Sequence, residues 1–148
     1  MDKKSKILKQ LKQEIKNTDL KLSRIEMLCR SSFIPRDMLI RKGLYNRVGG
    51  FDTTFTLYED WDLKIRLAEC SEYVYSGENG VAYRQHDSGL SKSGLKANIL
   101  FRYKVLAKNL REDSNLLKIR CFTSFSLWAV KSILAVLKRY GMKMIRVK

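Results

Sequence analysis

The chain has 148 residues, 45% of them hydrophobic and one of them proline, a composition that excludes a disordered linker and supports one folded domain. Its formal net charge is +15, to which residues 1–28 (eight basic, four acidic) contribute +4, residues 29–92 (nine of each) contribute zero, and residues 93–148 (thirteen basic, two acidic) contribute +11. The basic C-terminal part would suit an anionic membrane surface, a nucleic acid or a polyphosphate, and charge alone does not choose among them.

Cysteine usage and hydropathy restrict the compartment and the kind of site. The three cysteines, Cys29, Cys70 and Cys121, are widely separated and form neither a CxxC pair nor a Cys/His cluster with metal-ligand spacing. Reduced cytosolic thiols are therefore the expectation. No apolar segment of the secretory type follows the basic N-terminus, and no uninterrupted apolar run has the length of a bilayer-spanning helix.

Three elements are predicted before the first glycine turn. Apolar residues recur at helical spacing within residues 3–16, which predicts an amphipathic helix in the segment 1–24. Residues 25–34 predict a strand that ends at Pro35. Residues 36–44 predict a short helix that leads to the turn at Gly49-Gly50.

A helix is expected next, directly after a cluster of acidic residues, because Trp61, Ile65 and Ala68 would share one of its faces. Residues 72–76 and 81–86 are rich in β-forming residues and are separated by glycine and asparagine. They predict two short strands joined by a turn.

The last third of the chain is predicted to be helical. Apolar stripes over residues 95–110 and 116–140 indicate two helices, the second stopping at the glycine that follows it. The fold expected from all these elements is α/β, with an α+β-like arrangement of a few short strands framed by helices. We divide the chain into an amphipathic helix (1–24), a central segment (25–92) and a basic helical tail (93–148).

The most informative feature is a group of three carboxylates, Glu59, Asp60 and Asp62, at the start of the helix that follows the glycine turn. Aromatic residues flank this group. Carboxylates in the first turn of a helix are stabilised by the helix dipole and by free backbone N–H groups, so capping is one explanation. The other is a site that takes a proton from a bound hydroxyl.

The order of several motifs resembles the C-terminal half of family 2 glycosyltransferases, which have the GT-A fold. In that family a GGFD-like turn precedes an acidic ED motif that opens a helix, and a strand ending in Y-R-x-H follows. The resemblance covers about residues 25–92 and implies the α/β C-terminal portion of a GT-A fold. The matching residues are Gly49-Gly50-Phe51-Asp52, Glu59-Asp60-Trp61-Asp62-Leu63 and Tyr83-Arg84-Gln85-His86, with Ser31-Ser32-Phe33-Ile34-Pro35 resembling the acceptor-side strand.

The resemblance implies an inverting transfer of a sugar from a nucleotide-diphosphate sugar to an acceptor hydroxyl. Such a transfer needs one carboxylate to accept the hydroxyl proton while the oxygen attacks an oxocarbenium-like centre. By resemblance, Asp60 is this general base, and Glu59 positions the acceptor or orients Asp60. We expect Asp62 and Arg66 to be structural and to pair at i,i+4 spacing.

Substrate and metal contacts are also implied by the resemblance. Trp61, Arg84 and Ser32 are assigned to substrate binding, although Arg84 would alternatively pair with Asp87. His86, the single histidine, is either a ligand of the metal or donor diphosphate or a hydrogen-bonded structural residue. A divalent cation, Mn or Mg, is the implied cofactor, but the DxD motif that usually binds it belongs to the donor half, and residues 1–28 contain no Asp-x-Asp.

The resemblance lacks one half of such an enzyme. A complete member begins with a nucleotide-binding βαβ half that ends in the DxD motif, and residues 1–28 contain nothing similar. Three explanations follow: the product of a split or truncated gene that is inactive alone, a complement to a separate donor-half polypeptide, or a remnant without activity. We favour the first, because the ED region is intact.

The tail leaves two interpretations open. Residues 121–140 are apolar apart from hydroxyl groups, Lys131 and a basic end, which suits an in-plane helix at an anionic membrane. A helix packed on the domain with a solvated basic tip fits equally well. A cytoplasmic location, peripheral at the inner face of the membrane, would agree with a glycan or lipid-linked acceptor.

A basic module that binds nucleic acid or membranes without catalysis is the alternative function. Nucleic acid is the less favoured partner, because the sequence has no helix-turn-helix, RNP or zinc-finger pattern and its basic residues are not interleaved with aromatic ones.

Overall fold

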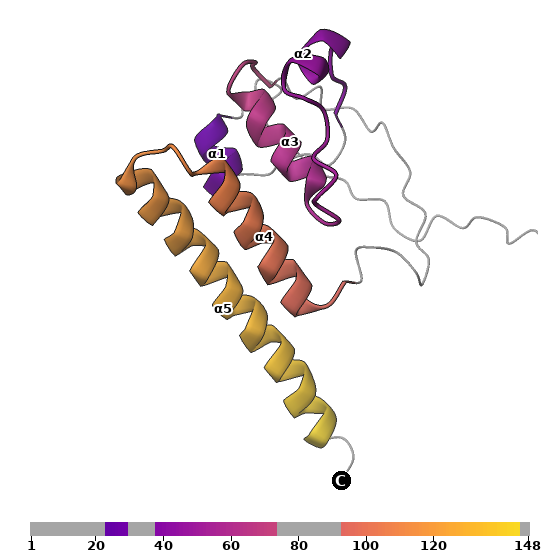
Figure 1. Ribbon diagram of the computed structural model, residues 1–148. Coiled ribbons are helices and arrows are strands. Elements are labelled where there is room, and N and C mark those ends of the chain that lie inside the picture. Colours follow the sequence, from indigo (N-terminus) through magenta and orange to yellow (C-terminus); the bar gives the residue numbers. More distant parts are fainter. Residues whose placement is uncertain (1–22, 30–37, 74–92, 146–148) are drawn as a thin grey trace, which may run out of the picture.

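The computed structural model describes residues 23–29, 38–73 and 93–145, and every regular element in these ranges is an α-helix. Figure 1 shows α4 and α5 as an antiparallel pair, with α1 and α3 packed near the end where the pair is joined. From there α5 runs the full length of α4 and extends beyond its first residue. The helices are α1 (Arg24–Cys29), α2 (Lys42–Arg47), α3 (Glu59–Ala68), α4 (Leu95–Asn109) and α5 (Asn115–Ile145).

The α/β prediction, and with it the C-terminal portion of a GT-A fold, is wrong for the described residues, which contain helices and no strand. The strand expected over residues 25–34 is instead helical as far as Cys29, and residues 30–34 lie outside the described ranges. Of the strand expected over 72–76, the two described residues, 72 and 73, are not in a strand. The strand expected over 81–86 lies outside the described residues.

A capping box explains why α1 is a helix. The Ser23 backbone N–H donates to Glu26 Oε2 over 2.8 Å, and Ser23 Oγ accepts the N–H of Glu26 over 3.3 Å. This reciprocal S-x-x-E pattern satisfies two donors that a helix start would leave unpaired. The helix also buries three consecutive side chains, Met27, Leu28 and Cys29, whereas a strand would turn alternate residues to opposite faces.

The helical predictions agree better with the structure. The helix after the acidic cluster is α3, and the helix over residues 95–110 is α4. The helix expected over 36–44 begins only at Lys42. The last helix does not stop at Gly141, because α5 continues through it to Ile145.

One hydrophobic core joins α1, α3, α4 and α5. The indole N–H of the buried Trp61 donates to the carbonyl of Met27 over 2.7 Å, which ties α3 to α1. Ser124 Oγ donates to the carbonyl of Cys29 over 3.0 Å and ties α5 to the same helix. The buried core side chains are Met27, Leu28, Cys29, Phe55, Trp61, Ile65, Val105, Leu106, Leu110 and Cys121.

Arg24 clamps one corner of this core. Its guanidinium donates to both carboxylate oxygens of Asp113, at 3.0 and 2.9 Å, and to the carbonyl of Asn109 at 2.7 Å. Its Nε donates to Glu69 over 2.8 Å. These contacts raise the pKa of Arg24, the Asp113 hydrogen bond most strongly. The clamp therefore links the start of α1 to the end of α3 and to the α4–α5 turn.

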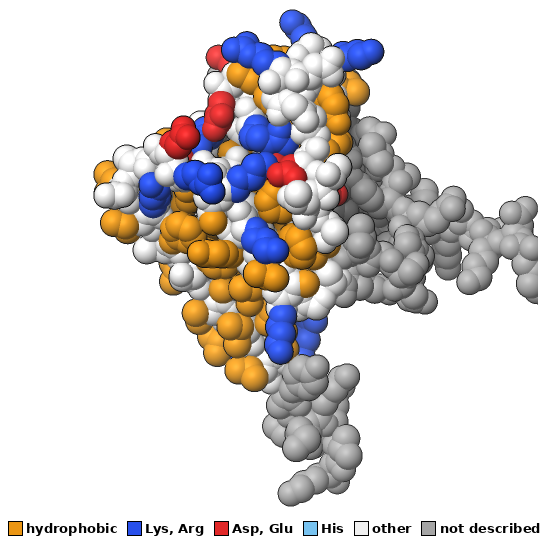
Figure 2. All heavy atoms as spheres, viewed as in Figure 1, with side chains coloured by type: hydrophobic (Ala, Val, Ile, Leu, Met, Phe, Trp, Pro, Cys, Tyr) orange, Lys and Arg blue, Asp and Glu red, His pale blue; other side chains and the backbone are white. Residues whose placement is uncertain are grey.

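The helix α5 is apolar on average, although it contains no uninterrupted apolar run of membrane length. Its residues Asn115–Arg139 have a mean hydropathy of 1.4 and are long and apolar enough to cross a membrane by length and composition, and only 6% of this window is buried. Lys131 interrupts the apolar run in the sequence without lowering the average below that range. Figure 2 shows hydrophobic side chains over much of the surface formed by α5.

The core predicts a clear difference between two leucines. Leu106→Ala, at a side chain that is 1% exposed, should lower the free energy of unfolding by about 3 kcal/mol, because it leaves a cavity between α4 and its neighbours. Leu116→Ala, at a side chain that is 79% exposed, should change it by less than about 0.5 kcal/mol. Urea unfolding followed by circular dichroism measures both, and equal losses would contradict this packing.

Candidate functional site

The glycine turn before α3 has a conformation that other residues would not adopt without strain. Gly49 and Gly50 have φ values of +77° and +67°, in the left-handed region. A Cβ on Gly50 would lie 2.8 Å from the ring of Tyr45, a side chain of α2. The N–H of Gly50 also donates to the carbonyl of Tyr45 over 2.9 Å. The turn is therefore closed tightly onto α2.

Arg66 of α3 fastens this turn to the helix that carries the acids. Its guanidinium donates to the carbonyl of Val48 and, over 2.7 Å, to the carbonyl of Gly50. Its Nε donates to Asp62 over 2.9 Å, four residues earlier on α3. The predicted i,i+4 pair of Asp62 and Arg66 is thus confirmed, and its structural role is to anchor the glycine turn.

Asp62 is completely buried and is satisfied by donors from two helices. Besides the hydrogen bond from Arg66, its carboxylate accepts one from the ammonium group of Lys108 at 3.0 Å and one from the side-chain amide of Asn109 at 2.8 Å. Lys108 and Asn109 belong to α4. A buried carboxylate is stable only when its charge and lone pairs are compensated, and these donors provide that compensation.

Lys108 extends the network to the GGFD turn. Its ammonium group also donates to Asp52 over 2.8 Å. Asp52 accepts two further hydrogen bonds, from the backbone N–H and the hydroxyl of Thr54. The Lys108 hydrogen bond, followed by those from Thr54, holds the pKa of Asp52 well below its ordinary value. Asp52, Asp62, Arg66, Lys108 and Asn109, called the Asp62 network below, join the turn, α3 and α4.

Asp60 lies differently from Asp62, although both are on the first turn of α3. Its side chain is 41% exposed. One carboxylate oxygen accepts the N–H of Trp61 over 2.8 Å, and the other lies 3.3 Å from the ammonium group of Lys64. Glu59, the first residue of α3, is half-buried. The two acids predicted to act on the acceptor therefore both reach the surface.

The residue before this acidic pair has an unusual backbone. Tyr58, at the N-cap of α3, has φ +65° and ψ +19°, which is the left-handed region and uncommon for a non-glycine residue. Its hydroxyl donates to Asn98 of α4 over 2.8 Å. Strained backbone of this kind often occurs at functional sites, where surrounding contacts keep it in place.

Trp61 is placed in the core and not on the surface. It is 2% exposed, and its indole N–H is bonded to Met27. Its assignment to substrate binding stays a prediction. The remaining candidates, Ser32, Arg84 and His86, lie outside the described residues, as does Asp87, the alternative partner of Arg84.

The described residues do not fit a divalent cation. Among residues 23–29, 38–73 and 93–145 no group of three or more His, Cys, Asp or Glu side chains could hold a metal ion. Asp60, the exposed acid nearest to such a role, is paired with a lysine. We therefore derive no step through a metal, and the predicted cation stays a prediction about other residues.

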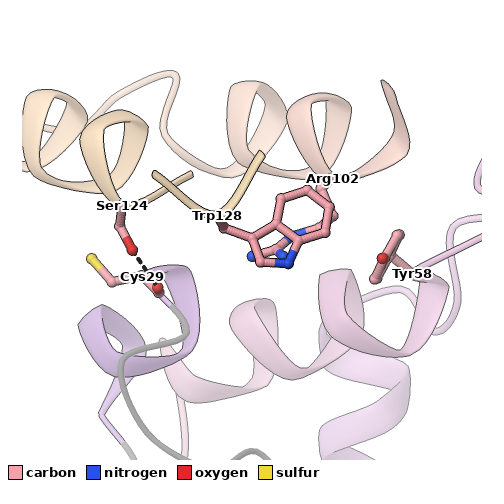
Figure 3. Close-up of a pocket in the computed structure, with 5 residues that line it drawn as sticks. All are labelled: Cys29, Tyr58, Arg102, Ser124 and Trp128. Carbon is pink, nitrogen blue, oxygen red and sulfur yellow. Dashed lines mark hydrogen bonds between the residues drawn. The ribbon is translucent and has the colours of Figure 1, made fainter. Parts of the chain in front are cut away.

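A cavity of about 320 Å³ lies between α1, α4 and α5 and the start of α3 (Figure 3). Its lining includes Cys29, Tyr58 and the guanidinium of Arg102, which lies 3.7 Å from the ring centre of Trp128 and 5.5 Å from that of Trp61. Arg102 is 7% exposed, and its buried charge is stabilised by cation–π contacts with these two aromatic rings. Ser124 and Trp128 complete the lining.

Sequence reasoning missed Lys108 and Asn109, the α4 residues that compensate Asp62. They lie 46 and 47 positions further along the chain, and no local pattern connects them to α3. A weak signal existed, because a buried helix face that contains an acid requires cationic partners from a neighbouring element.

Comparisons of the chain with protein-family models, with curated proteins and with solved structures find no match.

The Asp62 network predicts unequal effects of two conservative substitutions. Asp62→Asn should lower the free energy of unfolding by about 3 kcal/mol, because Arg66 and Lys108 lose the buried carboxylate that compensates them. Asp52→Asn, at a solvated carboxylate bound to the same Lys108, should lower it much less. Urea unfolding at neutral pH measures both, and a larger loss for Asp52→Asn would contradict the network.

Proposed function

We propose that this chain provides the acceptor-side carboxylates of a sugar transferase that uses a nucleotide-diphosphate sugar, with Asp60 as the general base. One observation carries the proposal, namely the different placement of the acids on the first turn of α3. Asp62 is buried and compensated by α4, whereas Asp60 and Glu59 reach the surface at the positive end of the helix dipole. The motif resemblance supports the choice of reaction.

The placement of Asp60 supports its proposed role as general base. Such a base must present a carboxylate oxygen within hydrogen-bond distance of the acceptor hydroxyl. The N–H of Trp61 fixes the orientation of the Asp60 carboxylate, and 41% of the side chain is accessible. Because Trp61 is itself anchored in the core, the carboxylate is attached to a rigid part of the fold.

In the proposed reaction the acceptor oxygen attacks the anomeric carbon on the face opposite the departing nucleotide diphosphate. Asp60 takes the hydroxyl proton during this attack, and the configuration at the anomeric carbon is inverted. Glu59, its neighbour on the same helix end, binds another acceptor hydroxyl and positions it. The acceptor is a glycan or a lipid-linked saccharide.

The donor sugar is bound elsewhere in this proposal. Among the described residues no group of three or more His, Cys, Asp or Glu side chains could hold a metal ion for a nucleotide diphosphate. A separate donor-half polypeptide, with its own divalent cation, would complete the site, and the chain would be inactive without it. The alternative function is a basic membrane- or nucleic-acid-binding module without catalysis.

Reconstitution with a donor-half polypeptide tests the assignment of the base. Transfer from a radiolabelled nucleotide sugar to a membrane glycolipid extract should fall by about 100-fold or more in Asp60→Asn, because the acceptor loses its proton acceptor. Glu69→Gln, at an exposed acid on the other end of α3, is the matched control and should retain activity. Full activity of Asp60→Asn would exclude Asp60 as the base.

We further propose that the protein is cytoplasmic and lies at the inner face of the membrane, with α5 on an anionic lipid surface. In α5 the side chains of Cys121, Phe125 and Trp128 face the fold, where they pack on the core or line the cavity. The opposite face is apolar and exposed. Its exposed side chains are Leu116, Ile119, Leu127, Val130, Ile133, Leu134 and Leu137.

Charge supports an anionic surface as the partner of this face. The 31 residues of α5 include no acidic side chain. Arg120, Lys131 and Lys138 are exposed and lie at one edge of the apolar stripe by helical spacing. A basic helix with an exposed apolar face suits binding in the plane of an anionic bilayer.

Vesicle sedimentation tests the membrane proposal. The protein should sediment with phosphatidylglycerol-rich vesicles at low salt and be released by about 1 M salt, at which charges are strongly screened. Leu127→Gln combined with Leu134→Gln should weaken sedimentation, whereas Leu39→Gln, at an exposed leucine outside α5, should not. Absence of sedimentation at low salt would refute the proposal, and salt-sensitive RNA binding instead would favour the nucleic-acid alternative.

A further inference from the structure

Two buried thiols face each other where α1 meets α5. Cys29 is the last residue of α1, and Cys121 lies in the second turn of α5. Their Sγ atoms are 3.1 Å apart, although the residues are 92 positions apart in the sequence. The side chains are 7% and 1% exposed. The proposed function uses neither of them.

The backbone around the pair is held by a separate contact. Ser124, one turn after Cys121, donates its hydroxyl to the carbonyl of Cys29 over 3.0 Å. Since a disulfide has an S–S distance of about 2.0 Å, the two sulfur atoms need to approach by about 1 Å to form one. Cys70, the third cysteine, lies just after α3, and its thiol instead donates to the carbonyl of Leu67 at the end of that helix.

The two thiols differ in access. Cys29 lines the cavity of about 320 Å³, whereas Cys121 is not part of its lining (Figure 3). Burial raises the pKa of the Cys121 thiol to about 12, which disfavours its thiolate in the reduced protein. Cys29, at 7% exposed against 1% for Cys121, is therefore the more accessible of the two thiols.

We propose that Cys29 and Cys121 are a redox modification site, which forms a reversible intramolecular disulfide by exchange with a small disulfide of the glutathione type. The Cys29 thiolate attacks one sulfur of the small disulfide, forms a mixed disulfide and releases the first small thiolate, which takes up a proton. Cys121 Sγ then loses its proton to solvent, attacks Cys29 Sγ and expels the second small thiol. Two protein thiols are oxidised, and one small disulfide is reduced to two thiols.

The bond would change how α5 is attached to the fold. In the reduced protein the α1–α5 contact depends on packing and on the Ser124 hydrogen bond. A covalent link across 92 positions removes much of the freedom of the unfolded chain. We expect the dithiol in a reducing glutathione pool and the disulfide when that pool becomes oxidised.

Equilibration of the folded protein in buffers of reduced and oxidised glutathione tests the proposal, with the Cys70→Ser variant as the background. Peptide mass spectrometry after alkylation should find a Cys29–Cys121 cross-linked peptide that has lost two hydrogen atoms and disappears with dithiothreitol. The oxidised protein should unfold at a temperature higher by on the order of 10 °C, because a long loop is closed.

Two further variants keep the test independent of folding defects. Cys121→Ala should retain a single glutathione on Cys29, since the second exchange cannot occur, and Cys29→Ala should leave Cys121 unmodified in the folded protein. The peptide mass spectrometry on the Cys70→Ser background tests the proposal even if neither of these variants folds. Separate glutathione adducts on both cysteines, disulfide-linked dimers, or thiols that stay reduced in fully oxidised glutathione would each overturn the proposal.

Discussion

The buried carboxylate of Asp62 is the interaction on which the arrangement of the site depends. It is a fully buried negative charge, and such a charge is tolerated only where several donors converge on it. Here Arg66 comes from the same helix, and Lys108 and Asn109 come from α4. The angle between α3 and α4 is therefore set by charge compensation as well as by the packing of apolar side chains.

The same carboxylate determines where the glycine turn lies. Arg66 donates to the carbonyls of Val48 and Gly50 from the same guanidinium that Asp62 binds through Nε. The glycine turn precedes α3, and at the start of this helix Asp60 and Glu59 reach the surface. One buried acid thus positions two exposed ones, although it is itself inaccessible to any substrate.

Local features of the fold were predictable from the sequence, and distant ones were not. The 3.6-residue period of apolar side chains was enough to predict α3, α4 and most of α5, and the i,i+4 spacing was enough for the Asp62–Arg66 pair. The period failed for α1, because six residues are too few to distinguish a buried helix from a strand. The Ser23–Glu26 capping box was the local signal that would have decided for the helix. The α4 partners of Asp62 needed the tertiary structure.

The position of Arg102 gives the protein an internal optical reporter. The chain has two tryptophans, one on α3 and one on α5, and both rings lie close to the same guanidinium. A separation of α5 from the other helices would remove the cation from Trp128 and admit water to the cavity that this ring lines. The intrinsic tryptophan fluorescence of the unlabelled protein should consequently respond to the detachment of α5.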